Sequence, residues 1–252
     1  MWKILVTNDD GVGSSGIKAL ANGLCALGDV WIVAPEAEAS ASGHALTLRR
    51  PLRIKRVRDR VFGVDGTPTD CVNIAVSQIL RGLPDLVVSG INQGFNLGDD
   101  VTYSGTVAGA LEGVLLGAPS MAVSQQRVRG VFDFEQATAA AVHLAKGILE
   151  NGLPPRTLLN VNVPSSQARG LKVTVQARRN HTTSVAEAFD PRREPYYWID
   201  EAHLEWETDD RSDYQAIREG WISITPLQSD WTAHGEVERI EALVAGVTAE
   251  VS

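Results

Sequence analysis

Two adjacent carboxylates, Asp9 and Asp10, end the first apolar run of this 252-residue chain. The run Ile4–Val6 before them is typical of a strand buried on both faces, as in the middle of a parallel sheet. The acids then lie at the carboxyl end of that strand, the edge of an open α/β sheet where ligands bind. Like charges a few ångströms apart repel unless a positive group lies between them, so we interpret the pair as part of a divalent-cation site. The alternative is a turn that caps a helix beginning near Gly16.

Two later loops supply further oxygen donors at the same predicted edge. Ser40 follows the apolar strand at residues 30–34, and Asn92 follows the apolar strand at residues 84–89. Because parallel strands place their carboxyl ends together, we expect both side chains near the two acids. Sites built only from oxygen select Mg²⁺, Mn²⁺ or Ca²⁺ over zinc. Each residue also has a plainer explanation, since small hydroxyl and amide side chains are common in loops for conformational reasons.

A glycine- and amide-rich loop, and the helix start that follows it, suit a phosphate group. Asn96 can donate an amide N–H to a phosphate oxygen. Ser104, Gly105 and Thr106 open a helix, whose unpaired first-turn N–H groups and dipole favour an oxyanion. An ordinary serine or threonine cap explains the same residues without a ligand. The Walker pattern G-x-x-x-x-G-K-[ST] is absent from the sequence.

The order of elements predicts an α/β fold with a doubly wound, mostly parallel sheet. Apolar runs of strand length alternate with helical spacing as far as residue 165. We treat residues 1–252 as a single α/β domain, with a catalytic core at 1–165 and a carboxyl-terminal extension at 166–252. The extension carries a charged, aromatic segment around Tyr196–Trp198 that can bury little by itself. We therefore expect a β-hairpin and helix arm that packs on another subunit.

The segment between the second strand and the third predicted helix gives two further predictions. Residues 45–64 alternate apolar and polar side chains, first at 46–48 and again at 52–54, which favours β structure. Thr67, Pro68 and Asp70 then form a strong helix start, and the helix runs to about Leu80. We interpret Asp70 as a capping residue rather than a catalytic one.

The composition narrows the class of protein. With 44% hydrophobic and 21% charged residues, the chain is typical of an ordinary globular domain, and its formal charge of −8 argues against a general binder of nucleic acid polymers. A local basic run at residues 49–60 is either solvated surface or a guide for an anionic substrate. No uncharged stretch reaches the roughly 18 apolar residues of a membrane span. Two distant cysteines, Cys25 and Cys71, and the lack of a signal-peptide pattern lead us to expect a cytoplasmic protein.

Several long motifs carry a family resemblance. In chain order they are Ile4–Gly11, Ala34–Pro35 with Ser40 downstream, Gly66–Val72, Ser89–Val101, Tyr103–Val107 and Ile222–Leu227. Over nearly the whole chain they resemble the SurE survival-protein family, whose members are metal-dependent 5′/3′-nucleotidases acting on nucleoside monophosphates. The resemblance implies one Mg²⁺ or Mn²⁺ per subunit, held by Asp9, Asp10, Ser40 and Asn92, with Asn96 and the Ser104–Thr106 turn near the phosphate. It also implies a Rossmann-like core, and homodimers or homotetramers in which the carboxyl-terminal arm exchanges between subunits.

These residues suggest a mechanism as a hypothesis. The cation would polarise the phosphoryl oxygens and lower the pKa of a water that attacks phosphorus in line. Asn96 and the N–H groups of residues 104–106 would stabilise the developing charge, while Asp9 or Asp10 orients or deprotonates the water. An aspartyl-phosphate route is the chemical rival, but it normally uses two acids separated by one residue and a downstream lysine. Hydrolysis of short polyphosphate at the same site, and a nucleotide-binding sensor without hydrolysis, are the alternative functions.

Overall fold

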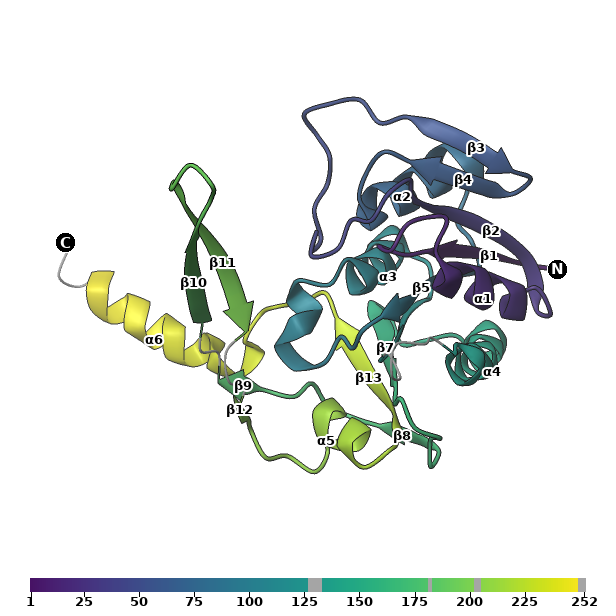
Figure 1. Ribbon diagram of the computed structural model, residues 1–252. Helices are drawn as coiled ribbons and strands as arrows, with labels where there is room; N and C mark the ends of the chain where they lie inside the picture. Colours follow the sequence, from purple (N-terminus) through teal and green to yellow (C-terminus); the bar gives the residue numbers. More distant parts are fainter. Residues whose placement is uncertain (127–132, 181–182, 202–204, 249–252) are drawn as a thin grey trace.

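A nine-stranded sheet forms the centre of the computed structural model, which describes residues 1–126, 133–180, 183–201 and 205–248 (Figure 1). From one edge to the other its strands are β3 (Ile54–Arg58), β4 (Val61–Val64), β2 (Gly28–Pro35), β1 (Trp2–Thr7), β5 (Leu86–Gln93), β6 (Ser120–Gln125), β7 (Thr157–Val163), β13 (Ile222–Gln228) and β8 (Leu171–Val173). The six strands from β4 to β7 are mutually parallel. This arrangement confirms the predicted doubly wound, mostly parallel sheet.

The chain winds outward from β1 in both directions. β2 pairs with one side of β1 and β5 with the other, so the strand order reverses between β1 and β5. In open α/β sheets a crevice forms outside the carboxyl ends of the strands at such a switch point. The two acids that follow β1 and the polar loop that follows β5 therefore both open onto this crevice.

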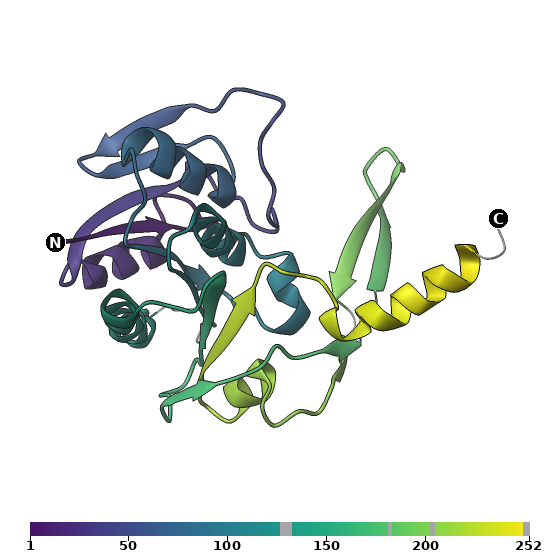
Figure 2. The ribbon, with the colours of Figure 1, turned by 180° about the vertical axis from the view of Figure 1, so that it is seen from behind.

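Helices cover the two faces of the sheet (Figures 1 and 2). α1 (Ser15–Leu24) and α4 (Glu135–Asn151) pack on one face, and α2 (Pro68–Ile74), the π-helical turn Ala75–Ile79 and α3 (Gly105–Leu116) pack on the other. Alternate residues of a strand face opposite sides. In β1, Ile4 and Val6 accordingly enter the core under α1 and α4, while Leu5 enters the core under α2. Burial on both faces explains why the run reads as continuously apolar.

The predicted β structure at residues 45–64 is correct only in part. β3 begins at Ile54, and residues 45–53 form no strand. The backbone N–H of Thr47 donates to the Asp70 carboxylate at 2.9 Å instead of to a neighbouring strand. The Asp70 side chain thus binds the backbone N–H of Thr47, which would have bonded to a neighbouring strand if residues 46–48 had formed the predicted strand. Asp70 itself forms the predicted capping box with Thr67 at the start of α2.

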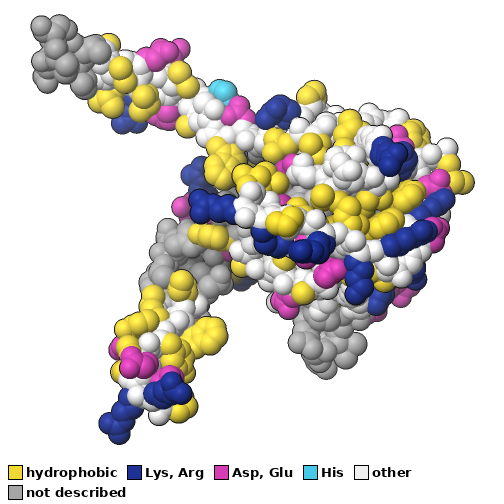
Figure 3. Space-filling view, turned by 90° about the horizontal axis from the view of Figure 1, so that it is seen from above, with side chains coloured by type: hydrophobic (Ala, Val, Ile, Leu, Met, Phe, Trp, Pro, Cys, Tyr) yellow, Lys and Arg dark blue, Asp and Glu magenta, His cyan; other side chains and the backbone are white. Residues whose placement is uncertain are grey.

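The carboxyl-terminal extension contributes to the sheet and also stands away from it. β13 pairs antiparallel with β7, and β8 adds to its far side. A hairpin of β10 (Thr183–Phe189) and β11 (Pro195–Glu201) and the helix α6 (Val237–Thr248) project from the body, as the prediction of a hairpin and helix arm required (Figures 1 and 3). The short strands β9 (Arg179–Asn180) and β12 (Glu205–Trp206) pair with each other, and the helix α5 (Asp213–Arg218) packs on β13. None of the described helices is long and apolar enough to span a membrane.

Candidate functional site

Backbone contacts draw three loops together at the switch point. The N–H of Ala39 donates to the backbone carbonyl of Asp9 at 2.8 Å. The N–H of Gln93 donates to the carboxylate of Asp10. Each of these donors is the chain neighbour of a predicted metal ligand, Ser40 in the first case and Asn92 in the second. The convergence expected from the sheet topology is therefore present, although the role of each residue stays a prediction.

Asp9 is buried and Asp10 is half-buried, and the charges that act on them from the described residues are negative. Burial is the largest cause that raises the pKa of Asp9, and the Thr106 hydroxyl opposes the rise. Burial, followed by the charge of Asp9, raises the pKa of Asp10 to about 6. The charged groups acting on the pair are all carboxylates, Glu38 being the third. Asp10 Oδ2 is buried and has no hydrogen-bond donor among the described residues. Such an uncompensated pair fits a divalent cation, which supplies the missing positive charge.

The other two predicted ligands, Ser40 and Asn92, donate local hydrogen bonds that leave their side-chain oxygens available as acceptors. Ser40 donates its hydroxyl to Glu38 Oε1 at 2.9 Å, so the lone pairs of the hydroxyl oxygen are left to accept a cation. Asn92 donates its Nδ2 to the carbonyl of Gly94 at 3.1 Å, which orients the amide. Its Oδ1 is then the atom that a cation can use. Among the described residues no cluster of three or more His, Cys, Asp and Glu is suited to a metal, so a site here depends on the hydroxyl and the amide.

The start of α3 lies directly against the acidic pair. Ser104 caps the helix by accepting from the N–H of Val107 at 3.1 Å. The next residue, Gly105, has no room for a side chain, because a Cβ there would lie 2.9 Å from Asp9 Oδ2 and 2.9 Å from Ser42 Oγ. The hydroxyl and the backbone N–H of Thr106 both donate to the Asp9 carboxylate. The helix start predicted to hold phosphate is thus also the support of one predicted metal ligand.

Asn96 is held by the sheet below it. Its side-chain Nδ2 donates to Ser124 Oγ at 2.8 Å, and its backbone bonds to the amide side chains of Asn160 and Asn162. An amide nitrogen carries two N–H groups, so one of them is left for a ligand oxygen. The predicted donor role of Asn96 is therefore compatible with its contacts.

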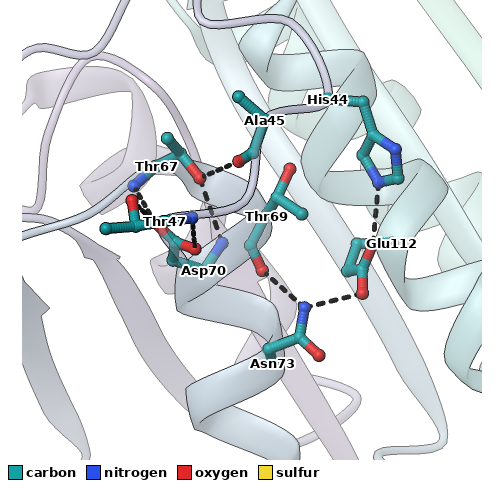
Figure 4. Close-up of polar contacts among 8 residues, drawn as sticks. All are labelled: His44, Ala45, Thr47, Thr67, Thr69, Asp70, Asn73 and Glu112. Atoms are coloured by element: carbon teal, nitrogen blue, oxygen red, sulfur yellow. Dashed lines mark hydrogen bonds and ion pairs between the residues drawn. The ribbon is translucent and has the colours of Figure 1, made fainter. Parts of the chain in front are cut away.

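The long loop that carries Ser40 is fastened to α2 and α3 further along its length (Figure 4). His44 Nε2 lies 2.7 Å from Glu112 Oε2, and Asn73 Nδ2 donates to Glu112 Oε1 at 2.6 Å. Thr67 donates its hydroxyl to the carbonyl of Ala45 at 2.7 Å. Glu112 is buried on α3, two helical turns below Gly105. The fastenings confirm the structural role predicted for Asp70 and add Glu112, which no sequence pattern indicated.

Residues Gly11–Gly16 match the pattern G-x-G-x-x-G between β1 and α1, a signal that sequence reasoning overlooked. The structure explains Gly11 by its φ of +95° and Gly16 by close packing. Gly16 touches β5 so closely that a Cβ would lie 2.2 Å from the carbonyl oxygen of Ile91. Ser14 caps α1, and its hydroxyl also accepts from Asn8 Nδ2 at 2.8 Å. Glu38 and Ser42 were overlooked as well, and only their position beside Ser40 could have indicated them.

Comparison with known proteins gives one consistent result. A family model described as "Survival protein SurE" matches residues 4–183. A protein of Syntrophotalea carbinolica named 5′-nucleotidase SurE is 51% identical, over 91% of this chain and 92% of the relative. One of Thermus thermophilus, named 5′-nucleotidase SurE 1, is 49% identical over 97% of this chain and 99% of its own. The crystal structure of the SurE protein from Aquifex aeolicus superposes with a TM-score of 0.85 at 42% identity, covering 95% of this chain and 98% of that one.

Proposed function

This chain belongs to the SurE survival-protein family, and from that premise we propose that it hydrolyses nucleoside 5′- and 3′-monophosphates to nucleoside and phosphate with the help of a divalent cation. The family supports a phosphoric monoester hydrolase, since relatives at about half identity are named 5′-nucleotidases. The metal requirement, the 3′ activity and the attack by water are the finer parts of the proposal.

One observation carries the metal requirement. Asp9 is buried and Asp10 half-buried at the switch point, neither has a positive partner among the described residues, and the buried Asp10 Oδ2 accepts no hydrogen bond from them. Asp9, Asp10, Ser40 and Asn92 would hold one Mg²⁺ or Mn²⁺ per subunit. When bound, the cation would neutralise charge on the phosphoryl group and acidify the attacking water.

The chain's own groups would do the rest. The helix start at Ser104–Thr106 lies against Asp9, so the positive end of the α3 dipole there would favour the charge of a phosphoryl group. Asn96, fixed at the edge of the sheet, would donate to an equatorial phosphoryl oxygen. Asp10 Oδ2, which accepts no hydrogen bond from the described residues, would orient the attacking water.

The test is phosphate release from adenosine 5′- and 3′-monophosphates, measured with Mn²⁺, with Mg²⁺ and after removal of metal by chelation. We expect release that stops on chelation and returns when Mn²⁺ is added. Asp9→Asn should lose activity while its circular dichroism is unchanged, and Asp59→Asn, at an exposed acid of the β3–β4 turn, is the matched control. Binding of nucleotide without release would instead favour a sensor, and full activity in Asp9→Asn would remove Asp9 from the site.

Assembly into homodimers or homotetramers is part of the same proposal. The hairpin and α6 expose large apolar side chains, among them Trp198 at 67% and Leu243 at 64% (Figure 3). Clustered apolar surface of this kind is typical of interfaces between subunits. Light scattering after gel filtration would show the subunit number, and a monomer at micromolar concentration would contradict this part.

A cytoplasmic location stays a prediction, supported by the two free thiols of Cys25 and Cys71.

A further inference from the structure

Two buried amides on β7 have no part in the function described so far. Asn160 and Asn162 alternate with Val161 and Val163, so they share the sheet face opposite the core under α1 and α4. Both side chains are fully buried. Leu158, two residues before Asn160, lies on the same face and packs in the apolar core under α3. Burying an amide costs free energy unless it is hydrogen-bonded, so the change from leucine to asparagine along this face needs a reason.

The reason is the backbone of Asn96. Asn162 Oδ1 accepts from the N–H of Asn96 at 2.9 Å, and Asn162 Nδ2 donates to the carbonyl of Asn96 at 3.0 Å. Asn160 Nδ2 donates to the same carbonyl at 2.8 Å. The side chain of Asn96 donates to Ser124 on the neighbouring strand β6 at 2.8 Å. Four hydrogen bonds from two strands thus fix one residue of a loop that has no regular structure between β5 and the 3₁₀ turn at Gly98–Thr102.

This arrangement is better suited to positioning than to stability. Asn160 Oδ1 is buried and has no hydrogen-bond donor among the described residues, and its amide cannot turn over without losing the bond to Asn96. A buried acceptor without a partner costs about 1–3 kcal/mol. Leucine on the same face would avoid that cost. The unsatisfied oxygen therefore lowers stability, whereas the same amide fixes the position of Asn96.

We propose that Asn162 and Asn160 are positioning residues for the phosphate monoester. They hold Asn96 so that its second amide N–H meets a phosphoryl oxygen bound at the start of α3. The inference rests on the proposed function, because it assigns Asn96 a contact with substrate. A donor that is already fixed before the substrate arrives stabilises developing charge without first being ordered.

The experiment compares three variants of the full chain. Asn162→Leu removes both bonds to the Asn96 backbone, and Asn160→Leu removes one bond together with the unsatisfied oxygen. Thr174→Val is the matched control, since Thr174 is also buried on the same polar side of the sheet, but among the described residues its hydroxyl bonds to Ser223 and Thr225 and not to Asn96. Each protein is assayed for kcat and KM with adenosine 5′-monophosphate and Mn²⁺, for Mn²⁺ affinity by calorimetry without substrate, and for hydrogen exchange of residues 94–98.

We expect Asn162→Leu to lower kcat/KM by about 10- to 100-fold, because misplacing a positioned group by about 1 Å costs up to about 100-fold. Exchange in residues 94–98 should become faster, while Mn²⁺ affinity stays that of the wild type. Asn160→Leu should lower kcat/KM less, without loss of thermal stability, because the bond it removes is offset by the buried oxygen it eliminates. A role in stability alone would instead lower the melting temperature of this variant and leave its kcat/KM intact.

Unchanged kcat/KM in a folded Asn162→Leu protein would overturn the inference, as would an equal loss in Thr174→Val. If Asn162→Leu fails to fold, Asn160→Leu decides by the same criteria. If the wild type releases no phosphate, the proposed function fails on its own. In that case hydrogen exchange alone tests whether Asn160 and Asn162 hold Asn96 in place, and unchanged exchange at residues 94–98 in the variants would overturn the inference.

Discussion

Thr106→Val tests how the start of α3 supports the acidic pair. The substitution keeps the shape of a fully buried side chain and removes the hydroxyl that donates to Asp9. A hydrogen bond to a charged group contributes about 1.5–3 kcal/mol. Loss of a group that orients a metal ligand weakens metal binding by about 10- to 100-fold, which at about 1.4 kcal/mol per factor of ten is the same magnitude. We therefore expect the Kd for Mn²⁺ to rise by about 10- to 100-fold.

Calorimetric titration of Mn²⁺ into substrate-free protein measures this effect apart from catalysis. Thr106→Ser is the control, because it retains the hydroxyl on the same Cβ and should bind Mn²⁺ almost as the wild type does. Wild-type Mn²⁺ affinity in a folded Thr106→Val protein would refute the reasoning. It would show that the Thr106 hydroxyl satisfies a hydrogen-bond acceptor of Asp9 but does not orient the carboxylate for a cation.

Three further predictions concern close packing and buried polar groups. Gly105→Ala places a methyl group 2.9 Å from the Asp9 carboxylate, so kcat/KM for a nucleotide should fall by up to about 100-fold; an active variant would mean that the helix start can move aside. Asp213→Ala leaves three backbone N–H groups, two of them buried, without their acceptor and should lower the free energy of unfolding by about 3 kcal/mol in urea titrations, whereas an unchanged midpoint would contradict the assigned bonds. Thr67→Ala removes the N-cap of α2 and the bond to Ala45 and should cost about 1–2 kcal/mol in the same assay, with an exposed Thr→Ala substitution for comparison.

The parts of the fold that follow from local pattern were predictable. Runs such as Ile4–Val6 are apolar on both faces because helices cover both faces of a parallel sheet, and this alone indicates the doubly wound class. The convergence of the loops that carry Asp9, Ser40 and Asn92 was predictable for a related reason. Parallel strands share their carboxyl edge, so polar residues that follow neighbouring strands must come together there.

The remaining features depend on contacts between distant residues. Thr106 and Asp9 are 97 residues apart, and nothing near either one announces their bond. The alternation at 46–48 predicted a strand, but the Asp70 carboxylate took the Thr47 N–H. Asn160 and Asn162 did leave a trace, since two amides two residues apart in an apolar strand must face the same way. What they bind became evident only when the loop at Asn96 was seen above them.

The place of β13 in the sheet has a consequence for how the protein is made. This strand pairs with β7 along Thr157–Val163, yet it is synthesised more than fifty residues later. Until then the nascent chain presents β7 as an open edge, which can pair with other chains. The amides that bond to the Asn96 backbone lie on that same strand, so the strand that supports residues 94–98 is itself paired on both sides only after β13 has left the ribosome. A chain cut short before Ile222 would therefore be prone to aggregate rather than work as a smaller enzyme.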